Sequence, residues 1–185
     1  LWHDLVTGTS KWQDLVYVNY WTPYLIGYVP ALVLSFFVSV STALKLILCL
    51  SFFGFVAACV ALRRDFGSDP RLDWLFIPGF FGYAYAWGFY TFLVAAPVCV
   101  LFVLLANRYA IRPATGLGVA LFFADVVLFF SHGLIFVFAN AIGGTILIVR
   151  TKRFSSLLVT TIPYLVVGAW CVVYARFFMT PTDDV

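Results

Sequence analysis

Long, nearly uninterrupted apolar stretches are the feature that most limits how this chain can fold. A helix needs about 20 mostly apolar residues to cross the hydrocarbon core of a bilayer, and such stretches follow one another along most of the sequence. Hydrophobic residues make up 64% of the 185 residues and charged residues only 10%. A soluble domain of this size could not cover so much apolar surface with polar groups. We therefore expect an all-α integral membrane protein, because a helix satisfies its own backbone hydrogen bonds in lipid.

The apolar stretches predict a polytopic transmembrane helix bundle with about six spans. A polar hinge at residues 39–42 separates the first two stretches, and the stretch at 116–149 is long enough for two short helices. We place the turn between those two at Ser131-His132-Gly133, the polar break near its centre. Residues 1–185 then form one transmembrane domain, in which the aromatic-rich residues 1–22 suit the headgroup level. The predicted spans are residues 23–40, 45–62, 89–107, two helices within 116–149, and 156–177.

Residues 72–88 are apolar but lack the uninterrupted helical run that is typical of a span. They contain Pro78 and three glycines, together with interfacial aromatics such as Tyr83 and Trp87. Helix breakers and interfacial aromatic rings at this density are typical of a short re-entrant or surface-lying segment. We place this segment in an extracytoplasmic loop over residues 63–88.

The charged residues between the stretches predict an orientation. With the N-terminal end outside, six basic residues and no acid occupy the inner loops, while five basic residues, Arg63 and Arg64 among them, join the loop acids outside. Basic residues favour the cytoplasmic face, so we predict that both ends of the chain are extracytoplasmic. The net charge of +3 is too small to suggest nucleic acid as a partner. The inner basic residues would be Lys45, Arg108, Arg112, Arg150, Lys152 and Arg153.

Three polar residues lie within the apolar stretches. Asp125 stands in the middle of a run where a charge is costly, and intramembrane acids often mark a functional site. His132 follows seven residues later on the same helix face, about 10 Å away, so the two side chains do not touch directly. Asn140 continues the polar series beyond the turn. One interpretation is a proton or substrate site between helices. The other is an Asp125 hydrogen-bonded to a neighbouring helix, with His132 capping an interfacial turn.

Two further groups could bind ligands near the membrane surface. Arg63 and Arg64 end a span and could hold a lipid phosphate, or simply complement the helix dipole and extend toward water. The outer acids Asp4, Asp14 and Asp69 could bind a divalent cation or supply a base, or be ordinary solvated loop charges. The four cysteines lie in apolar runs without metal-binding spacing, so no cysteine metal centre is expected.

Several short motifs together resemble the membrane core of large bacterial multi-spanning proteins, similar to the GT-C glycosyltransferases. The resemblance implies an inner-membrane location and a polyprenyl-phosphate-linked sugar as substrate. Its family's catalytic acid lies on the first extracytoplasmic loop, and neither Asp4 nor Asp14 matches that motif, so no catalytic residue is transferred. Because the chain starts at Leu1, we expect a segment of a longer protein. The motifs are Pro23-Tyr24-Leu25-Ile26-Gly27-Tyr28, Pro78, Trp87-Gly88-Phe89-Tyr90-Thr91-Phe92-Leu93, Pro97, Phe130-Ser131-His132-Gly133 and Ile162-Pro163-Tyr164.

Three functional hypotheses follow. The first is part of a lipid-linked-sugar glycosyltransferase-like protein, with a lipid-sized groove near Trp87 and Arg63-Arg64 open to the outer face. The second is a transporter or proton-coupled module that uses Asp125 and His132. The third is a structural subunit of a membrane complex, whose partners are lipid and other membrane subunits. We favour the first, although the sequence leaves open whether the chain has any catalytic activity.

Overall fold

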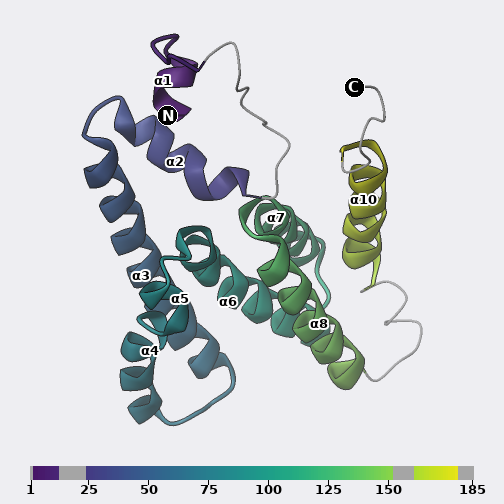
Figure 1. The fold of residues 1–185 in the computed structure, drawn as a ribbon. Helices are drawn as coiled ribbons and strands as arrows, with labels where there is room; N and C mark the ends of the chain where they lie inside the picture. Colours follow the sequence, from purple (N-terminus) through teal and green to yellow (C-terminus); the bar gives the residue numbers. More distant parts are fainter. Residues whose placement is uncertain (1, 13–23, 152–160, 179–185) are drawn as a thin grey trace.

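The computed structural model describes residues 2–12, 24–151 and 161–178, and this part of the chain is helical without a β-strand (Figure 1). Three helices, α3, α6 and α8, are long and apolar enough to cross a membrane. This confirms the predicted all-α membrane fold, whereas the number of about six spans stays a prediction. The elements are α1 Trp2–Val6, α2 Leu25–Ser35, α3 Val40–Asp65, η1 Pro70–Leu72, α4 Asp73–Phe80, α5 Tyr83–Ala86, α6 Tyr90–Ile111, α7 Thr115–Ser131, α8 Gly133–Arg150 and α10 Ile162–Phe178.

Helices α3 and α6 lie side by side and run in the same direction. A Cβ atom added to Gly54, near the middle of α3, would lie 3.4 Å from Cβ of Pro97 in α6. At their C-terminal ends, the Asp65 carboxylate accepts a hydrogen bond from Nε of Arg108 at 3.0 Å. The two contacts are 11 residues apart on both helices, so the helices stay in register over this length.

Helix α8 runs in the same direction as α6, because α7, which lies between them in the sequence, runs the opposite way. The turn at Ser131-His132-Gly133 ends α7 and begins α8, as predicted. At the far end of α8, the Arg150 guanidinium lies 5.6 Å from the centre of the Phe66 ring, just beyond α3. The C-terminal ends of α3, α6 and α8 therefore meet at one end of the bundle, which we call the basic end. Its described arginines are Arg63, Arg64, Arg71, Arg108, Arg112 and Arg150.

The predicted partition of charges between two faces is wrong. It placed Arg63, Arg64 and Asp65 outside, and Arg108 and Arg150 inside. The structure instead joins Asp65 to Arg108 directly and brings Arg150 to the residue after Asp65. The reason is that the chain returns along α3 before α6 begins, so α6 does not start where α3 ends.

This return is made by residues 73–88, and their interpretation as a re-entrant or surface-lying segment stays a prediction. Helix α4 starts beside the end of α3, where the Asp73 carboxylate binds Arg63. It then runs antiparallel to α3, and the Phe80 ring reaches Phe52 and Phe55 at centroid distances of 5.5 and 5.6 Å. Helix α5 and Gly88, whose φ of 70° suits glycine, complete the return. Helix breakers divide this return into two short helices.

The first predicted span, residues 23–40, is replaced by a short helix and a turn. Helix α2 has 11 residues, about 16 Å at 1.5 Å per residue, which is too short for a hydrocarbon core about 30 Å thick. The Ser39 side chain then caps α3 by accepting the N–H of Thr42 at 3.2 Å. Helix α2 contacts α3, α6 and α7 at the end of the bundle opposite the basic end (Figure 1).

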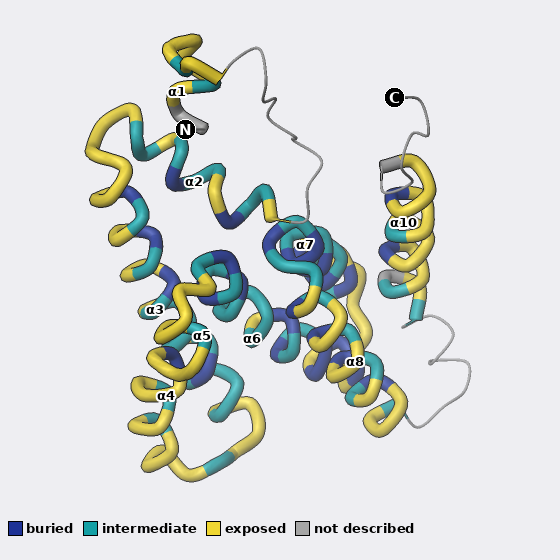
Figure 2. Tube along the Cα trace, in the orientation of Figure 1, coloured by how far each residue is buried: buried dark blue, intermediate teal, exposed yellow. Residues whose placement is uncertain are grey.

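The core lies around α6, which packs against α3, α7 and α8. Phe102 of α6 and Leu128 of α7 are fully buried, as is Ala139 of α8. A Cβ on Gly143 would lie only 2.8 Å from Cε1 of Phe102, so glycine permits this close approach of α8. Figure 2 shows the buried positions gathered on the facing sides of these helices, whereas much of α4 and α10 is exposed.

Candidate functional site

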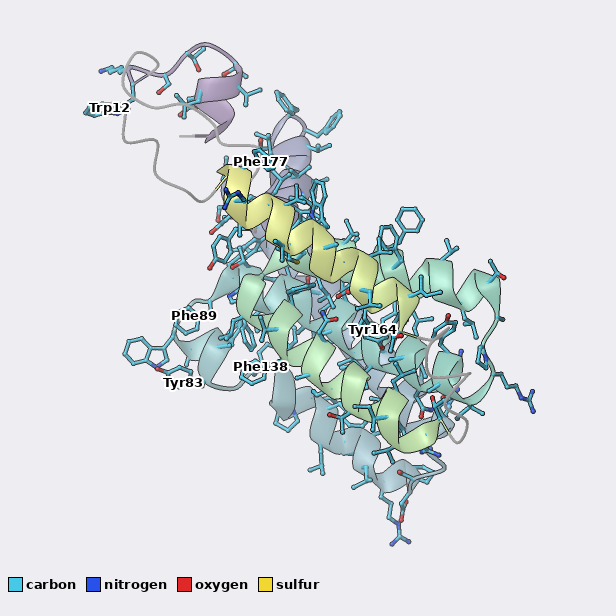
Figure 3. All side chains as sticks on the ribbon, turned by 90° about the vertical axis from the view of Figure 1, so that its right-hand side faces the viewer. Trp12, Tyr83, Phe89, Phe138, Tyr164 and Phe177 are labelled. Atoms are coloured by element: carbon cyan, nitrogen blue, oxygen red, sulfur yellow. The ribbon has the colours of Figure 1, made fainter. Side chains whose placement is uncertain are left out.

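A cavity of about 520 Å³ lies in the half of the bundle away from the basic end. Its walls come from the α4–α5 return, the first turns of α6, the middle of α3 and the α7–α8 junction. We call it the return cavity. Figure 3 shows two of its lining side chains, Tyr83 and Phe89, at one edge of the molecule, and their ring centroids lie 6.2 Å apart. Its lining includes Phe80, Gly82, Tyr83, Phe89, Phe92 and His132.

Of the three predicted polar residues Asp125, His132 and Asn140, only His132 lines this cavity. It links α7 to α8 in an extended conformation, with φ −166° and ψ 110°, and its side chain caps neither helix. Its ring lies edge-on to Tyr24 and Phe92, at centroid distances of 5.4 and 5.5 Å. Nδ1 is buried and has no hydrogen-bond partner within the described part of the chain. The predicted junction is confirmed, but the predicted capping role of the side chain is wrong.

The opposite wall of the cavity is an interrupted helix. Helix α4 ends at Phe80 and α5 begins at Tyr83, with Phe81 and Gly82 between them. Helix ends leave carbonyl and N–H groups without partners in their own helix, and both kinds meet at this break. The glycines on either side, Gly79 and Gly82, line the cavity, so the backbone itself forms part of its wall.

Asp125 belongs to a separate, packed contact. Its side chain is 2% exposed and its Oδ1 accepts a hydrogen bond of 2.7 Å from Nδ2 of Asn140, which also donates to the Phe136 carbonyl. This is the hydrogen-bonded contact with a neighbouring helix that the sequence offered as one interpretation. Asp125 lines neither the return cavity nor a second cavity of about 510 Å³ near the start of α7. Thus Asp125 and Asn140 come together, and His132 does not join them.

Tyr164 extends this packed region to α10. Its ring lies 6.1 Å from that of Phe102 and faces the bundle (Figure 3), and its hydroxyl is buried without a hydrogen-bond partner among the described residues. The hydroxyl fits because Gly143 has no side chain, since a Cβ there would lie 2.9 Å from it. Sequence reasoning named Tyr164 only as part of the motif Ile162-Pro163-Tyr164 and assigned it no role.

The lipid-phosphate candidates lie at the basic end, away from the return cavity. Arg63 donates to both carboxylate oxygens of Asp73, at 2.8 and 3.0 Å, and to the Ser68 carbonyl at 3.2 Å. This bidentate pair ties the end of α3 to the start of α4 and occupies the donors that a phosphate would need. Arg64 is exposed.

The acidic candidates do not form one group. Asp69 accepts the N–H of Arg71 at 2.8 Å and caps η1 at the basic end. Asp4 lies in α1, which contacts α2 at the opposite end, and Asp14 lies outside the described residues. Among the described residues, no three His, Cys, Asp or Glu side chains are placed to hold a metal ion.

Sequence reasoning also missed a polar network at the basic end. Asn107, which is 1% exposed, donates from Nδ2 to Asp65 at 3.0 Å beside the Arg108 contact. No spacing rule links residues more than 40 positions apart, so only the fold reveals this network.

Compared with known proteins, the chain matches no protein-family model, no curated protein and no solved structure.

Proposed function

We propose that this chain is an integral membrane protein that binds a lipid-like molecule by its apolar chain in the return cavity. The observation that supports this most is the cavity itself, whose volume of about 520 Å³ is within the range of about 300–1,000 Å³ usual for small-molecule sites. Its walls are largely aromatic and aliphatic, which suits a hydrocarbon chain.

The charges support an orientation with the basic end in the cytoplasm. Six described arginines lie there, against Lys11, Lys45 and Arg176 at the other end, and cytoplasmic loops carry the excess of basic residues. The proposed crossings are then α3, the α4–α5 return, α6, α7, α8 and α10. The count stays at six, but residues 73–88 replace residues 23–40. Both α1 and the end of α10 would be extracytoplasmic (Figure 1).

A lipid-linked-sugar glycosyltransferase-like protein of a bacterial inner membrane is the more specific form of this proposal. The return cavity lies beside the Trp87-bearing segment, since Tyr83 both lines the cavity and contacts Trp87 at 5.6 Å. It would hold the polyprenyl chain in the outer half of the bilayer. Because Arg63 is paired with Asp73, the phosphate-binding role proposed for this arginine finds no support.

The transporter alternative has less support. It requires Asp125 to reach a substrate or proton path, whereas this side chain accepts a hydrogen bond in a packed helix contact. The alternative of a structural subunit makes no use of the cavity.

Photo-crosslinking of the chain in membranes tests the lipid-binding proposal. We expect an alkyl-diazirine polyprenyl-phosphate probe to label peptides from residues 79–93. Ala96→Phe should reduce this labelling about tenfold, because its ring displaces roughly two methylene groups of the bound chain. Ala57→Phe is the matched control, because Ala57 is exposed on α3 and does not line the cavity. If Ala96→Phe leaves the labelling of these peptides unchanged, the proposal is contradicted.

A further inference from the structure

The second cavity, of about 510 Å³, lies at the basic end of the bundle. It is formed by the last turn of α6, the loop that follows, and the first two turns of α7 and of α10, and we call it the α7 cavity. It shares no lining residue with the return cavity, so the two can be tested separately. Its lining is mostly apolar and includes Tyr109, Pro113, Ala114, Thr115, Gly118 and Val166.

Two helices begin at the α7 cavity. Helix α7 starts at Thr115 and α10 starts at Ile162, and both residues line the cavity. The N-cap residue of α7, Ala114, makes no side-chain hydrogen bond to the helix. The first N–H groups of a helix have no partner within it and carry a partial positive charge. The positive ends of two helix dipoles therefore meet here, which favours a negatively charged ligand group.

Tyr109 adds a hydroxyl group beside the first turn of α7. The residue is only 6% exposed, and a Cβ on Gly118 would lie 3.3 Å from its hydroxyl oxygen. Both residues line the cavity, so the hydroxyl lies at the cavity wall. It has no hydrogen-bond partner among the described residues, and it is not closed off from solvent as the hydroxyl of Tyr164 is. A hydroxyl that is free to donate at a helix N-terminus suits an oxyanion.

Arg112 adds a full positive charge next to the cavity. It directly precedes residues 113–115, which belong to the lining. Its side chain is exposed and forms no ion pair with any described residue, whereas Arg108, one turn earlier, is bound to Asp65. An unpaired guanidinium can hold a phosphate by two parallel hydrogen bonds. None of the described residues that line the cavity is Asp or Glu, so no carboxylate there repels an anion.

The combination of an apolar cavity with donors on one side narrows the ligand class. A free phosphate would use the donors but leave the apolar walls unfilled. An uncharged lipid would fill the walls but give Arg112 and the helix N-termini no negative partner. A lipid with an anionic headgroup satisfies both parts of the site.

We propose that the α7 cavity binds an anionic phospholipid, whose acyl chain fills the cavity and whose phosphate lies between the first turn of α7, the Tyr109 hydroxyl and Arg112. This inference goes beyond the lipid proposed for the return cavity, and neither site requires the other. With the basic end in the cytoplasm, the lipid belongs to the cytoplasmic leaflet, whose surface is made negative by anionic lipids.

The test uses the chain in lipid nanodiscs with trace photoactivatable phosphatidylglycerol or phosphatidylcholine, both carrying the same mid-chain diazirine. Labelling of peptides containing residues 115–122 or 162–166 is measured relative to that of α8, which does not line the cavity. We expect phosphatidylglycerol to label these peptides more strongly. Arg112→Gln should reduce its labelling about tenfold and Tyr109→Phe about threefold, because each removes a donor to a charged phosphate.

Two matched controls separate the site from general effects. Arg71→Gln removes the same charge from another exposed arginine of the basic end, one that does not adjoin the cavity, and should leave the labelling unchanged. Val166→Trp should reduce labelling by both lipids, because its ring fills the cavity. Val173→Trp, on a similarly exposed position of α10 outside the lining, should not. Unfolding temperatures in detergent micelles show that the variants are folded.

Three outcomes would overturn the inference. One is equal labelling by the two lipids that Arg112→Gln does not change. Another is an equal loss in Arg71→Gln and Arg112→Gln, because general surface charge would then explain the preference. The third is loss of labelling when soluble glycerol 3-phosphate is added, which would make the ligand a free phosphate instead of a lipid. Labelling of residues 79–93 by the polyprenyl-phosphate probe reports on the return cavity and is independent of all three.

Discussion

The two ends of the bundle differ in their charged side chains, several of which are paired at the basic end, although Oδ1 of Asn107 there has no hydrogen-bond partner among the described residues. At the basic end, Arg63 is paired with Asp73, and Asp65 accepts from both Asn107 and Arg108. At the other end, His132 and an interrupted backbone line an apolar cavity. Paired groups hold helices together, whereas an open cavity leaves space that a ligand can fill. The comparison predicts that changes at the basic end weaken folding, and that changes at the cavity leave folding intact.

The largest expected effect is that of Asp73→Asn. This substitution removes the negative charge that binds Arg63, whose side chain is only 10% exposed. We expect a loss of about 2–3 kcal/mol in the free energy of unfolding, because the charged hydrogen bonds weaken and the guanidinium stays partly buried. Thermal unfolding in detergent micelles measures it. Asp69→Asn is the control, since Asp69 is exposed and asparagine is an equally good cap. Equal effects of the two variants would refute the structural role of the Arg63–Asp73 pair.

Asn140→Ala should come next. It leaves the buried Asp125 carboxyl without its 2.7 Å donor, which should cost about 1–3 kcal/mol. Asp125→Asn should cost less, because an amide oxygen still accepts from Asn140. The same unfolding assay compares the two variants. A transport activity lost in Asp125→Asn despite unchanged stability would instead favour the transporter hypothesis.

A pair of glycines compares packed and open regions directly. A Cβ on Gly143 would lie 2.8 Å from the fully buried Phe102, so Gly143→Ala should cost about 1–2 kcal/mol through overpacking. A Cβ on Gly79 meets nothing within 4 Å, and alanine favours the helix, so Gly79→Ala should be neutral or stabilising by about 0.5 kcal/mol. Detergent unfolding temperatures that change alike in the two variants would argue against the open cavity wall.

The smallest expected effect is that of His132→Phe. Because Nδ1 is buried without a hydrogen bond within the described structure, replacing the imidazole with an apolar ring should not lower stability and should raise it by at most about 1 kcal/mol. The new ring keeps the edge-on packing against Tyr24 and Phe92. A loss of several degrees in the unfolding temperature would show that His132 supports the fold, and would remove the contrast between the two ends.

The sequence by itself determined the features that depend on neighbouring residues. Apolar length and composition determined that the chain forms membrane helices, and the polar triplet Ser131-His132-Gly133 located the α7–α8 turn. Pro78 and Gly82 signalled an interruption within residues 72–88. The sequence also singled out Asp125, His132 and Asn140, because polar groups are rare and costly in apolar stretches.

Only the tertiary structure decided the directions of the helices and the partners of the polar groups. Helix breakers show where a segment is interrupted, but not which helix it packs against. The return of residues 73–88 is fixed by the contacts of Asp73 with Arg63 and of Phe80 with Phe52. Asp65 likewise meets Asn107 and Arg108 more than 40 positions away. Such pairings depend on how helices pack in three dimensions, which local patterns of hydropathy and charge do not specify.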